Sequence, residues 1–187
     1  MEQSEVEIKS EMKEETDIRG WINLLRRIDE GDSTTNTYHL VAHTSKLLNS
    51  FGIKGDIWIG RAAVNKRHSR DTAHRLTEEE WIDVFESINN PLCISEYLKV
   101  KNGFRVYTQV EHNGENVCVG LEVRPIGRGI EISKVSTVFA RHRIPSEDTE
   151  TERILYRNER TPEESSTAPN SRLYPQASVA KVGNNFE

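Results

Sequence analysis

Residues 104–139, FRVYTQVEHNGENVCVGLEVRPIGRGIEISKVSTVF, decide the fold of this chain. Apolar and polar side chains alternate through the first part of this stretch, with the period of a half-buried β-strand. Asn113-Gly114 follows, and this dipeptide favours a tight hairpin because a primed turn needs positive φ at both central residues. A second alternating run and the turn Gly127-Arg128-Gly129 lead into a third run that ends at Phe139. The stretch therefore predicts an antiparallel meander of three strands.

The third run changes its phase partway along. Its apolar positions begin at Ile130 and Ile132 and then shift near Ser133-Lys134, which places Val135 on the apolar side. An extra residue on one strand of an antiparallel pair produces such a shift. We therefore predict a β-bulge in this strand.

Helices are predicted before the meander. A stripe of apolar residues runs from Trp21 to Ile28 and ends before Gly31, and a second helix is expected over residues 38–50. A third helix begins at Thr77, which forms a capping box with Glu80. It ends at Asn90-Pro91, because the residue before a proline avoids the α region.

The predicted fold class is therefore α+β. N-terminal helices precede a further helix and an antiparallel meander of about four strands, the first of them at Leu92–Leu98; a short strand is also expected at Ile53–Ile59. Residues 152–159 are expected to form an edge strand or a short helix. The expected divisions are a charged N-terminal segment with one short helix, an α+β domain and a disordered tail. They span residues 1–34, 35–160 and 161–187.

The charge of the chain is −5 overall but unevenly distributed. Residues 1–30 and 147–164 each carry a balance of −4, whereas residues 54–75 and 124–143 each carry +4. The two basic segments form an anion site if they converge in space, or two ordinary solvated faces if they do not. No membrane-length apolar run and no signal peptide are evident, so we expect no membrane partner and a cytoplasmic location.

The cysteines and histidines give no pattern typical of a metal site. Cys93 and Cys118 lack CxxC spacing, so two free thiols are expected, at least one of them in a strand. His39 and His43 fall at i and i+4 of the predicted second helix, a spacing that can share a metal ion, but no third ligand accompanies them. We expect no metal and no cofactor.

Two clusters of basic and hydroxyl side chains remain as candidates for chemistry. No P-loop, dinucleotide, nucleophile-elbow or zinc-finger motif is present. Histidines, cations and hydroxyls suit metal-independent RNA cleavage, in which one group takes the 2′-hydroxyl proton and another protonates the leaving 5′-oxygen. Composition alone favours ordinary solvated residues instead. The clusters are Lys66, His68 and His74 before the third helix, and Ser136, Thr137, Arg141 and His142 at the end of the third meander strand.

Five short motifs carry a resemblance to a known group of proteins. They are Lys66-Arg67-His68, His74 to Trp81, Asn90-Pro91, the strand 105–109 and the strand 132–139. Together they resemble phage-encoded nucleases of the barnase–EndoU–colicin–RelE-like (BECR) group, over about residues 35–160. The resemblance implies a helix followed by a four-stranded antiparallel sheet and toxin-like, metal-independent ribonuclease activity. Such domains occur in polyvalent proteins of phages and mobile elements, and some enter the host with the DNA.

The resemblance implies roles for individual residues. His74 is the expected general base, and His68 or His142 the expected acid. The expected electrostatic stabilisers are Lys66 and Arg141, beside the polar pair Ser136-Thr137. Substrate-binding residues are expected at Arg105, Tyr107, His142 and Arg143.

Tyr107 faces away from Val106 and either stacks an RNA base or packs across strands. A sheet glutamate of the barnase type is not evident, since Glu111 and Glu122 alternate as solvent-facing strand residues. The identity of the general base therefore stays open.

Three functions are compared. The first is a metal-independent endoribonuclease in the cytoplasm of a bacterial host, acting on single-stranded or transfer RNA, with a protein inhibitor or a parent polyvalent protein as partner. The second is a non-catalytic RNA- or protein-binding member of the same fold, which the acidic net charge and the missing sheet glutamate favour. The third is an ADP-ribosyltransferase, which the absence of a late glutamate motif disfavours.

Overall fold

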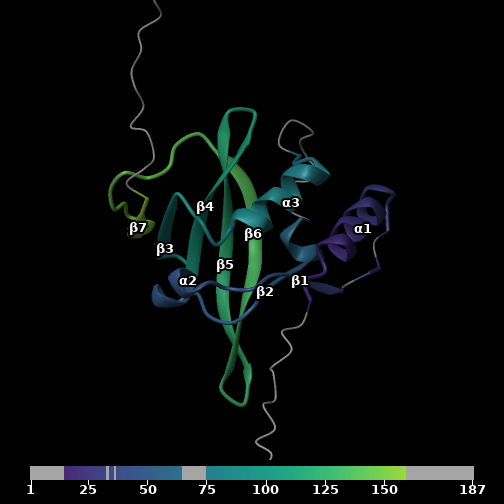
Figure 1. Cartoon of the computed structure of the whole chain (residues 1–187), viewed down its shortest axis with the longest axis horizontal. Coiled ribbons are helices and arrows are strands. Elements are labelled where there is room, and N and C mark those ends of the chain that lie inside the picture. Colours follow the sequence, from purple (N-terminus) through teal and green to yellow (C-terminus); the bar gives the residue numbers. More distant parts are fainter. Residues whose placement is uncertain (1–14, 33, 36, 65–74, 159–187) are drawn as a thin grey trace, which may run out of the picture.

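The structure, a computed structural model, describes residues 15–32, 34–35, 37–64 and 75–158. These residues form an α+β fold, as predicted, with a seven-stranded sheet whose order is β1-β2-β6-β5-β4-β3-β7 (Figure 1). Neighbouring strands are antiparallel except β2 and β6, which run parallel. The elements are α1 (Ile18–Asp29), β1 (Tyr38–Ala42), α2 (Lys46–Ser50), β2 (Ile57–Gly60), the 3₁₀ helix η1 (Arg61–Ala63), α3 (Glu78–Ser87), β3 (Cys93–Tyr97), β4 (Gly103–His112), β5 (Glu115–Gly127), β6 (Ile130–Arg141) and β7 (Glu152–Arg157).

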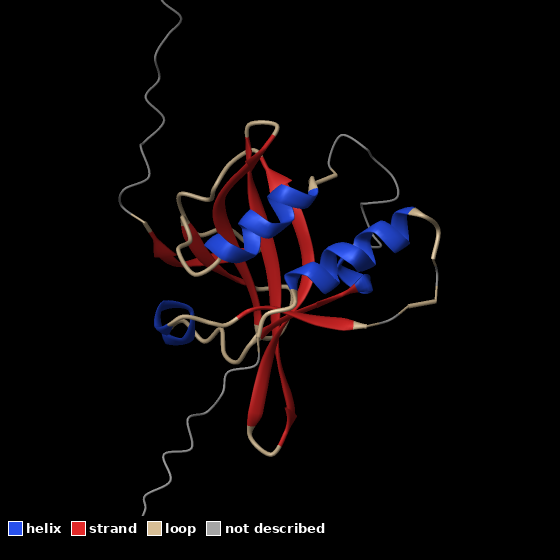
Figure 2. Ribbon diagram, turned by 45° about the vertical axis from the view of Figure 1, so that its right-hand side comes forward, coloured by secondary structure: helices blue, strands red, loops and turns tan. Residues whose placement is uncertain are grey.

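The predicted meander is confirmed and runs from β3 to β6. Its central turn is the two-residue hairpin at Asn113 and Gly114, whose φ angles are 53° and 77°. Positive φ at both positions is what a primed turn requires, and asparagine and glycine take it at least cost. The β5–β6 hairpin extends well beyond the rest of the sheet (Figures 1 and 2).

The sheet contains more strands than the sequence pattern indicated. β7 pairs with β3 at one edge, so residues 152–157 form the expected edge strand rather than a helix. At the other edge, β2 pairs with β6 and β1 pairs with β2. These pairings join segments far apart in the sequence, so the local alternation of apolar and polar residues does not predict them.

The helix predicted over residues 38–50 is wrong in its first half. Residues 38–42 form β1, and only Lys46–Ser50 is helical. Pairing with β2 buries Leu40 and Val41, and this tertiary burial outweighs the local helical pattern. His39 and His43 therefore do not share a helix face; their ring Nδ1 atoms lie 2.7 Å and 2.8 Å from carboxylate oxygens of Asp17 and Asp56.

The helices pack on one face of the sheet around a single hydrophobic cluster. Trp21 of α1, Leu48 of α2 and Trp81 of α3 are buried in it together with Val106 and Val119 of the sheet. Figure 2 shows α1 and α3 in front of the strands. The capping box is confirmed, since the Thr77 side chain accepts from the Glu80 amide and the Glu80 carboxylate accepts from the Thr77 amide.

A bulge is present in β6, but at Ser136 and not near Ser133-Lys134, where the sequence predicted it; Ser133 and Val135 face the same side without a change of phase. Leu121 pairs with Val135 and Gly120 pairs with Thr137, so Ser136 has no partner on β5. Before the bulge, the buried positions of β6 are Ser133 and Val135, whereas Ile130 is exposed. The predicted core positions Ile130 and Ile132 are therefore wrong, because the strand enters the sheet one residue out of phase with them.

The predicted free thiols are confirmed, since Cys93 in β3 and Cys118 in β5 are both unpaired and buried. Among the described residues no helix is long and apolar enough to cross a membrane. The division of the chain at residues 34 and 160 stays a prediction.

Candidate functional site

A pocket of about 390 Å³ opens on the sheet face opposite the helices. Its walls include Arg105 from β4, Thr137 and Arg141 from β6, and Tyr97 at the end of β3. Alternation along β4 explains the arrangement, because Val106 faces the helices and Arg105 therefore faces away from them. The pocket thus lies on the one face of the sheet that the helices leave uncovered.

The bulge at Ser136 shapes one wall of the pocket. A bulge places two consecutive residues of one strand opposite a single residue of its partner, and both Ser136 and Thr137 line the pocket. The partner is Gly120, where an added Cβ would lie 2.7 Å from Thr137 Cγ2 and 3.0 Å from Ser136 Oγ. The glycine therefore leaves room for both side chains.

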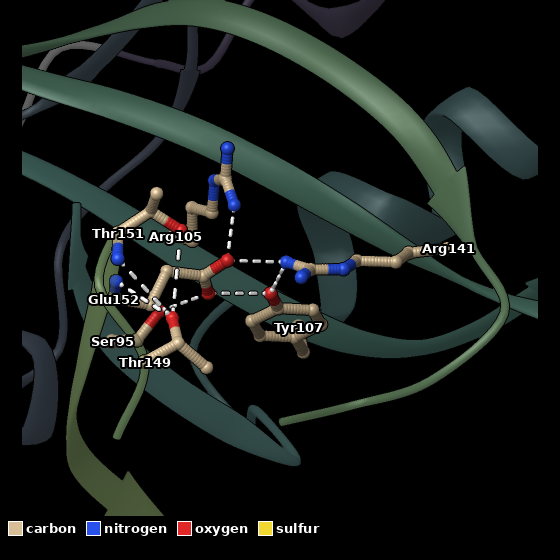
Figure 3. A network of polar contacts seen from close by, with 7 residues as sticks. All are labelled: Ser95, Arg105, Tyr107, Arg141, Thr149, Thr151 and Glu152. Atoms are coloured by element: carbon tan, nitrogen blue, oxygen red, sulfur yellow. Dashed lines mark hydrogen bonds and ion pairs between the residues drawn. The ribbon is translucent and has the colours of Figure 1, made fainter. Parts of the chain in front are cut away.

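Two arginines of the pocket are held by one carboxylate, that of Glu152. Glu152 is the first residue of β7 and has no exposed surface. Arg105 Nη1 and Arg141 Nη1 both donate to Glu152 Oε1 (Figure 3). The two guanidinium groups, whose side chains are 17% and 33% exposed, are thus brought together from β4 and β6.

The second carboxylate oxygen of Glu152 accepts from two hydroxyl groups. Ser95 Oγ donates to Glu152 Oε2 at 2.8 Å, and the Tyr107 hydroxyl donates to the same oxygen at 2.7 Å (Figure 3). Arg141 Nη1 also donates to the Tyr107 hydroxyl. Burial raises the pKa of the Glu152 carboxyl, but hydrogen bonds from Arg141, Tyr107 and Ser95 and the charge of Arg105 outweigh it, and the pKa lies below its usual value.

Backbone and aromatic contacts fix this cluster further. Glu152 N donates to Thr149 Oγ1 at 3.1 Å and Thr149 N donates to Glu152 O at 2.8 Å, which fixes the start of β7. The guanidinium carbon of Arg105 lies 4.0 Å from the ring centroid of Tyr97. The carboxylate and the ring together hold Arg105 in one position.

Four of the residues predicted from the sequence line this one pocket: Arg105, Ser136, Thr137 and Arg141. Tyr107 lies beside them but is fully buried, with its ring between Cys93 and Cys118. Its ring is therefore not available to stack a base. The ring packs against residues of the neighbouring strands, which was the alternative expectation. Its hydroxyl instead donates to Glu152.

His142 and Arg143 follow Arg141 but do not line the pocket. The His142 side chain is 79% exposed, and its Nδ1 lies 3.7 Å from Glu115 Oε1. Arg143 is exposed as well. Substrate contacts were predicted for both residues, but neither residue lines this pocket.

The predicted residues Lys66, His68 and His74 lie outside the described residues. The described residues on either side of them are Val64 and Arg75-Leu76. Val64 and Leu76 are buried in the hydrophobic cluster on the helix side of the sheet, opposite the face of the pocket. The expected convergence of the two basic clusters therefore stays a prediction.

Glu152 was missed because it lies in the acidic segment 147–164, which reads as a solvated flank. Glu152 alternates with Ile154 in the predicted strand, and Ile154 packs against the same cluster as Tyr107, which is a signal that the Glu152 side chain is buried rather than solvated. A second signal is that Arg105 lies on an otherwise well-packed strand, where a buried cation needs a carboxylate partner.

The described residues contain no group of three or more histidine, cysteine, aspartate or glutamate side chains able to hold a metal ion. Chemically, the pocket presents the guanidinium groups of Arg105 and Arg141 beside Ser136 and Thr137, and the buried Glu152 carboxylate lies behind the two arginines. Guanidinium groups match the geometry and charge of phosphate oxygens, so the arrangement suits binding of a phosphate.

A protein family model matches this chain. A family model described as the phage MuF-C-terminal domain matches residues 65–163, which is 99 of 187 residues and so more than half of the chain. The matched residues include α3, all strands from β3 to β7, and every pocket residue named above. No curated protein and no solved structure matches the chain.

Proposed function

Because the chain belongs to the phage MuF C-terminal domain family, we propose that it is a phage or mobile-element endoribonuclease of the BECR fold. It cleaves RNA without a metal ion, by attack of the 2′-hydroxyl on the adjacent phosphodiester. The observation that carries this proposal is the pocket in which Arg105 and Arg141 face one cavity from two strands. The helix α3 before an antiparallel meander supports the fold assignment.

The scissile phosphate binds at the two arginines. Negative charge grows on the phosphate oxygens as the 2′-oxygen attacks, and fixed cations stabilise that charge more in the transition state than in the substrate. The two guanidinium groups carry two positive charges and the Glu152 carboxylate carries one negative charge, so the cluster has a net positive charge. This charge attracts an RNA phosphate even though the whole chain is acidic.

Thr137 is the better of the two hydroxyl groups for contacting a phosphate oxygen. The Ser136 hydroxyl has one proton and donates it to the Gly120 carbonyl at 3.1 Å. Its lone pairs can only accept a hydrogen bond, and an ionised phosphate oxygen has no proton to donate. Thr137 also lines the pocket, and its hydroxyl makes no such bond among the described residues.

The proton transfers are assigned to histidines. In this proposal His74 takes the proton of the 2′-hydroxyl, the 2′-oxygen bonds to phosphorus, and the bond to the 5′-oxygen breaks as His68 or His142 protonates it. For this step His74 must reach the pocket, although Leu76, two residues later, is buried on the helix side of the sheet. The products are a 2′,3′-cyclic phosphate end and a 5′-hydroxyl end. Lys66 adds a further positive charge. The substrate is single-stranded or transfer RNA in the cytoplasm of a bacterial host, and a protein inhibitor or a parent polyvalent protein is the expected partner.

A second candidate function is a non-catalytic RNA-binding member of the same fold. It is favoured by one observation: no histidine is among the described residues that line the pocket. Behind them, burial together with the neighbouring Cys118 and Glu152 raises the pKa of Tyr107, and Glu152 has a lowered pKa, so neither of these two groups exchanges a proton near neutral pH. This candidate predicts RNA binding that weakens with salt and no turnover.

The test is incubation of the purified full chain with mixed cellular RNA, with and without EDTA. The variants are His74→Ala and Arg141→Ala, and the matched control is Arg153→Ala, because Arg153 binds Glu96 outside the pocket. We expect cleavage that survives EDTA, leaves cyclic phosphate ends and is lost in both site variants but not in the control. RNA binding without cleavage would select the second candidate, and neither binding nor cleavage would rule out both.

A further inference from the structure

We propose that Glu152 is a positioning residue of the pocket, which holds Arg105 and Arg141 where they bind phosphate and does not itself take a proton from RNA. This inference rests on the proposed function for the identity of the ligand, and on the described contacts for everything else. In this role Glu152, a glutamate of the sheet, is not the general base.

The hydrogen-bonding capacity of the Glu152 carboxylate is fully used. Each carboxylate oxygen has two lone-pair sites. Arg105 and Arg141 occupy those of Oε1, while Ser95 and Tyr107 occupy those of Oε2. A general base needs a free lone pair within hydrogen-bond reach of the proton that it abstracts, and Glu152 has none available.

The location of Glu152 is equally unsuited to proton transfer. Its side chain has no exposed surface, and it is absent from the residues that line the pocket. Arg105 and Arg141 line the pocket and separate the carboxylate from a ligand bound there. The lowered pKa of Glu152 also makes it a weak acceptor of a proton.

Both arginines keep donors for a ligand while Glu152 holds them. Only the Nη1 group of each makes a hydrogen bond within the described part of the chain, and a guanidinium has five N–H donors in all. Two neighbouring cations repel each other, and a shared carboxylate offsets that repulsion. Glu152 thus fixes the spacing of two cations that would otherwise move apart.

The positioning role and a purely electrostatic role predict opposite signs for one substitution. Glu152→Gln removes a negative charge beside the pocket, and by Coulomb's law alone this would strengthen the binding of an anion. If Glu152 positions the arginines, the same substitution weakens binding, because the amide holds neither guanidinium as a carboxylate does and the two separate.

The measurement is the affinity of a labelled single-stranded oligonucleotide whose riboses are 2′-O-methylated, so that it cannot be cleaved. Glu152→Gln is compared with Glu96→Gln, the same chemical change at a β3 residue that pairs with Arg153, the residue after Glu152 on β7. We expect Glu152→Gln to bind roughly tenfold more weakly and Glu96→Gln to bind as the unaltered chain does. Unchanged or tighter binding by folded Glu152→Gln would overturn the proposal.

A second variant covers the case in which Glu152→Gln does not fold. Tyr107→Phe keeps the buried ring and removes the hydroxyl that bonds both Glu152 and Arg141. It is expected to weaken oligonucleotide binding by a smaller factor, and full retention of affinity would count against positioning. In a chain that carries both Arg105→Ala and Arg141→Ala, the further change Glu152→Gln should have no effect on affinity.

Cleavage is read separately, so failure of the proposed function is distinguishable from failure of this inference. If the chain cleaves RNA, the acid limb of the pH profile of kcat/KM should keep its position in Glu152→Gln, since another group is the base. Loss of that limb would identify Glu152 as the base and overturn the proposal. If the chain binds RNA without cleaving it, the affinity measurements alone test the positioning role of Glu152.

Discussion

The indole of Trp21 in α1 packs edge-on against the indole of Trp81 in α3, with ring centroids 5.3 Å apart and an interplanar angle of 74°. Both side chains are buried in the cluster that also contains the helix-facing side of the sheet. α1 begins 60 residues before α3 in the sequence, yet both helices pack into the same hydrophobic core. The N-terminal helix is therefore part of what stabilises the pocket-bearing sheet.

Replacing Trp21 with alanine is expected to lower the free energy of unfolding by about 3–5 kcal/mol, because it removes a fully buried aromatic ring and leaves a cavity. Chemical denaturation followed by fluorescence measures the change. Arg19→Ala, at an exposed position of the same helix, is the control and should change stability little. A loss no larger in Trp21→Ala than in the control would show that α1 does not contribute to the core.

The capping box of α3 gives a second prediction. Thr77→Ala removes the hydroxyl that accepts from the Glu80 amide at 3.1 Å, and the expected cost is about 1 kcal/mol of stability. Thr77→Ser keeps a hydroxyl group and should retain most of that stability. Equal losses in the two variants would mean that the hydroxyl is not what stabilises the helix terminus.

Gly120 is expected to be intolerant of even a methyl group. Gly120→Ala places a Cβ 2.7 Å from Thr137 Cγ2, and overpacking of this kind costs about 1–3 kcal/mol. Thr137→Ser removes that methyl group, so Gly120→Ala should cost less stability in a chain that carries Thr137→Ser than in the unaltered chain. Thermal unfolding of the four chains tests this, and strictly additive effects would contradict it.

The stability of the chain should fall in acid partly through Glu152. Its pKa in the folded protein lies below the ordinary value of 4.5, so folding favours the ionised form. The resulting stabilisation is complete above about pH 4.5 and is lost as the pH falls through the lowered pKa of the folded state.

Glu152→Gln should therefore show a flatter dependence of melting temperature on pH in this acid range than the unaltered chain. Melting temperatures of the two chains measured across the acid range are the test. Parallel curves for the unaltered chain and Glu152→Gln would contradict the role of Glu152 in acid stability.

The two thiols are expected to be unreactive in the folded protein. Burial raises the pKa of Cys93 to about 11 and that of Cys118 to about 12, from an ordinary value of 9.0. Thiolate, the reactive form, is therefore scarce at mildly alkaline pH, and the burial of both side chains also blocks access. A colorimetric thiol reagent should detect no thiol until denaturant is added and two thereafter, and rapid reaction of the native chain would contradict the described packing.

Local features of the sequence determined much of the fold. The start of α3 follows from Thr77 and Glu80, which lie three residues apart and contact each other directly. The β4–β5 hairpin follows from Asn113-Gly114, because those two residues take positive φ at little cost. Such features are visible in the sequence because the interacting groups are close together along the chain.

The candidate pocket was only partly visible in the sequence. Strand alternation placed Arg105 away from the core, but the bulge that carries Ser136 and Thr137 into the pocket wall lies beyond the position at which the sequence predicted it. No local pattern indicated that residues 38–42 would form a strand, since β1 becomes buried only by pairing with β2.

The tertiary structure alone decided the role of Glu152. It lies 47 residues from Arg105 and 45 from Tyr107 in the sequence, and these contacts form only when β7 takes its place at the edge of the sheet. A carboxylate without exposed surface is stable only if cations and hydroxyl groups surround it, and those partners come from three other strands. The sequence by itself therefore specified α1, α3, the meander and four of the pocket residues. The pairing of distant strands placed Glu152, from an acidic segment, at the centre of the site.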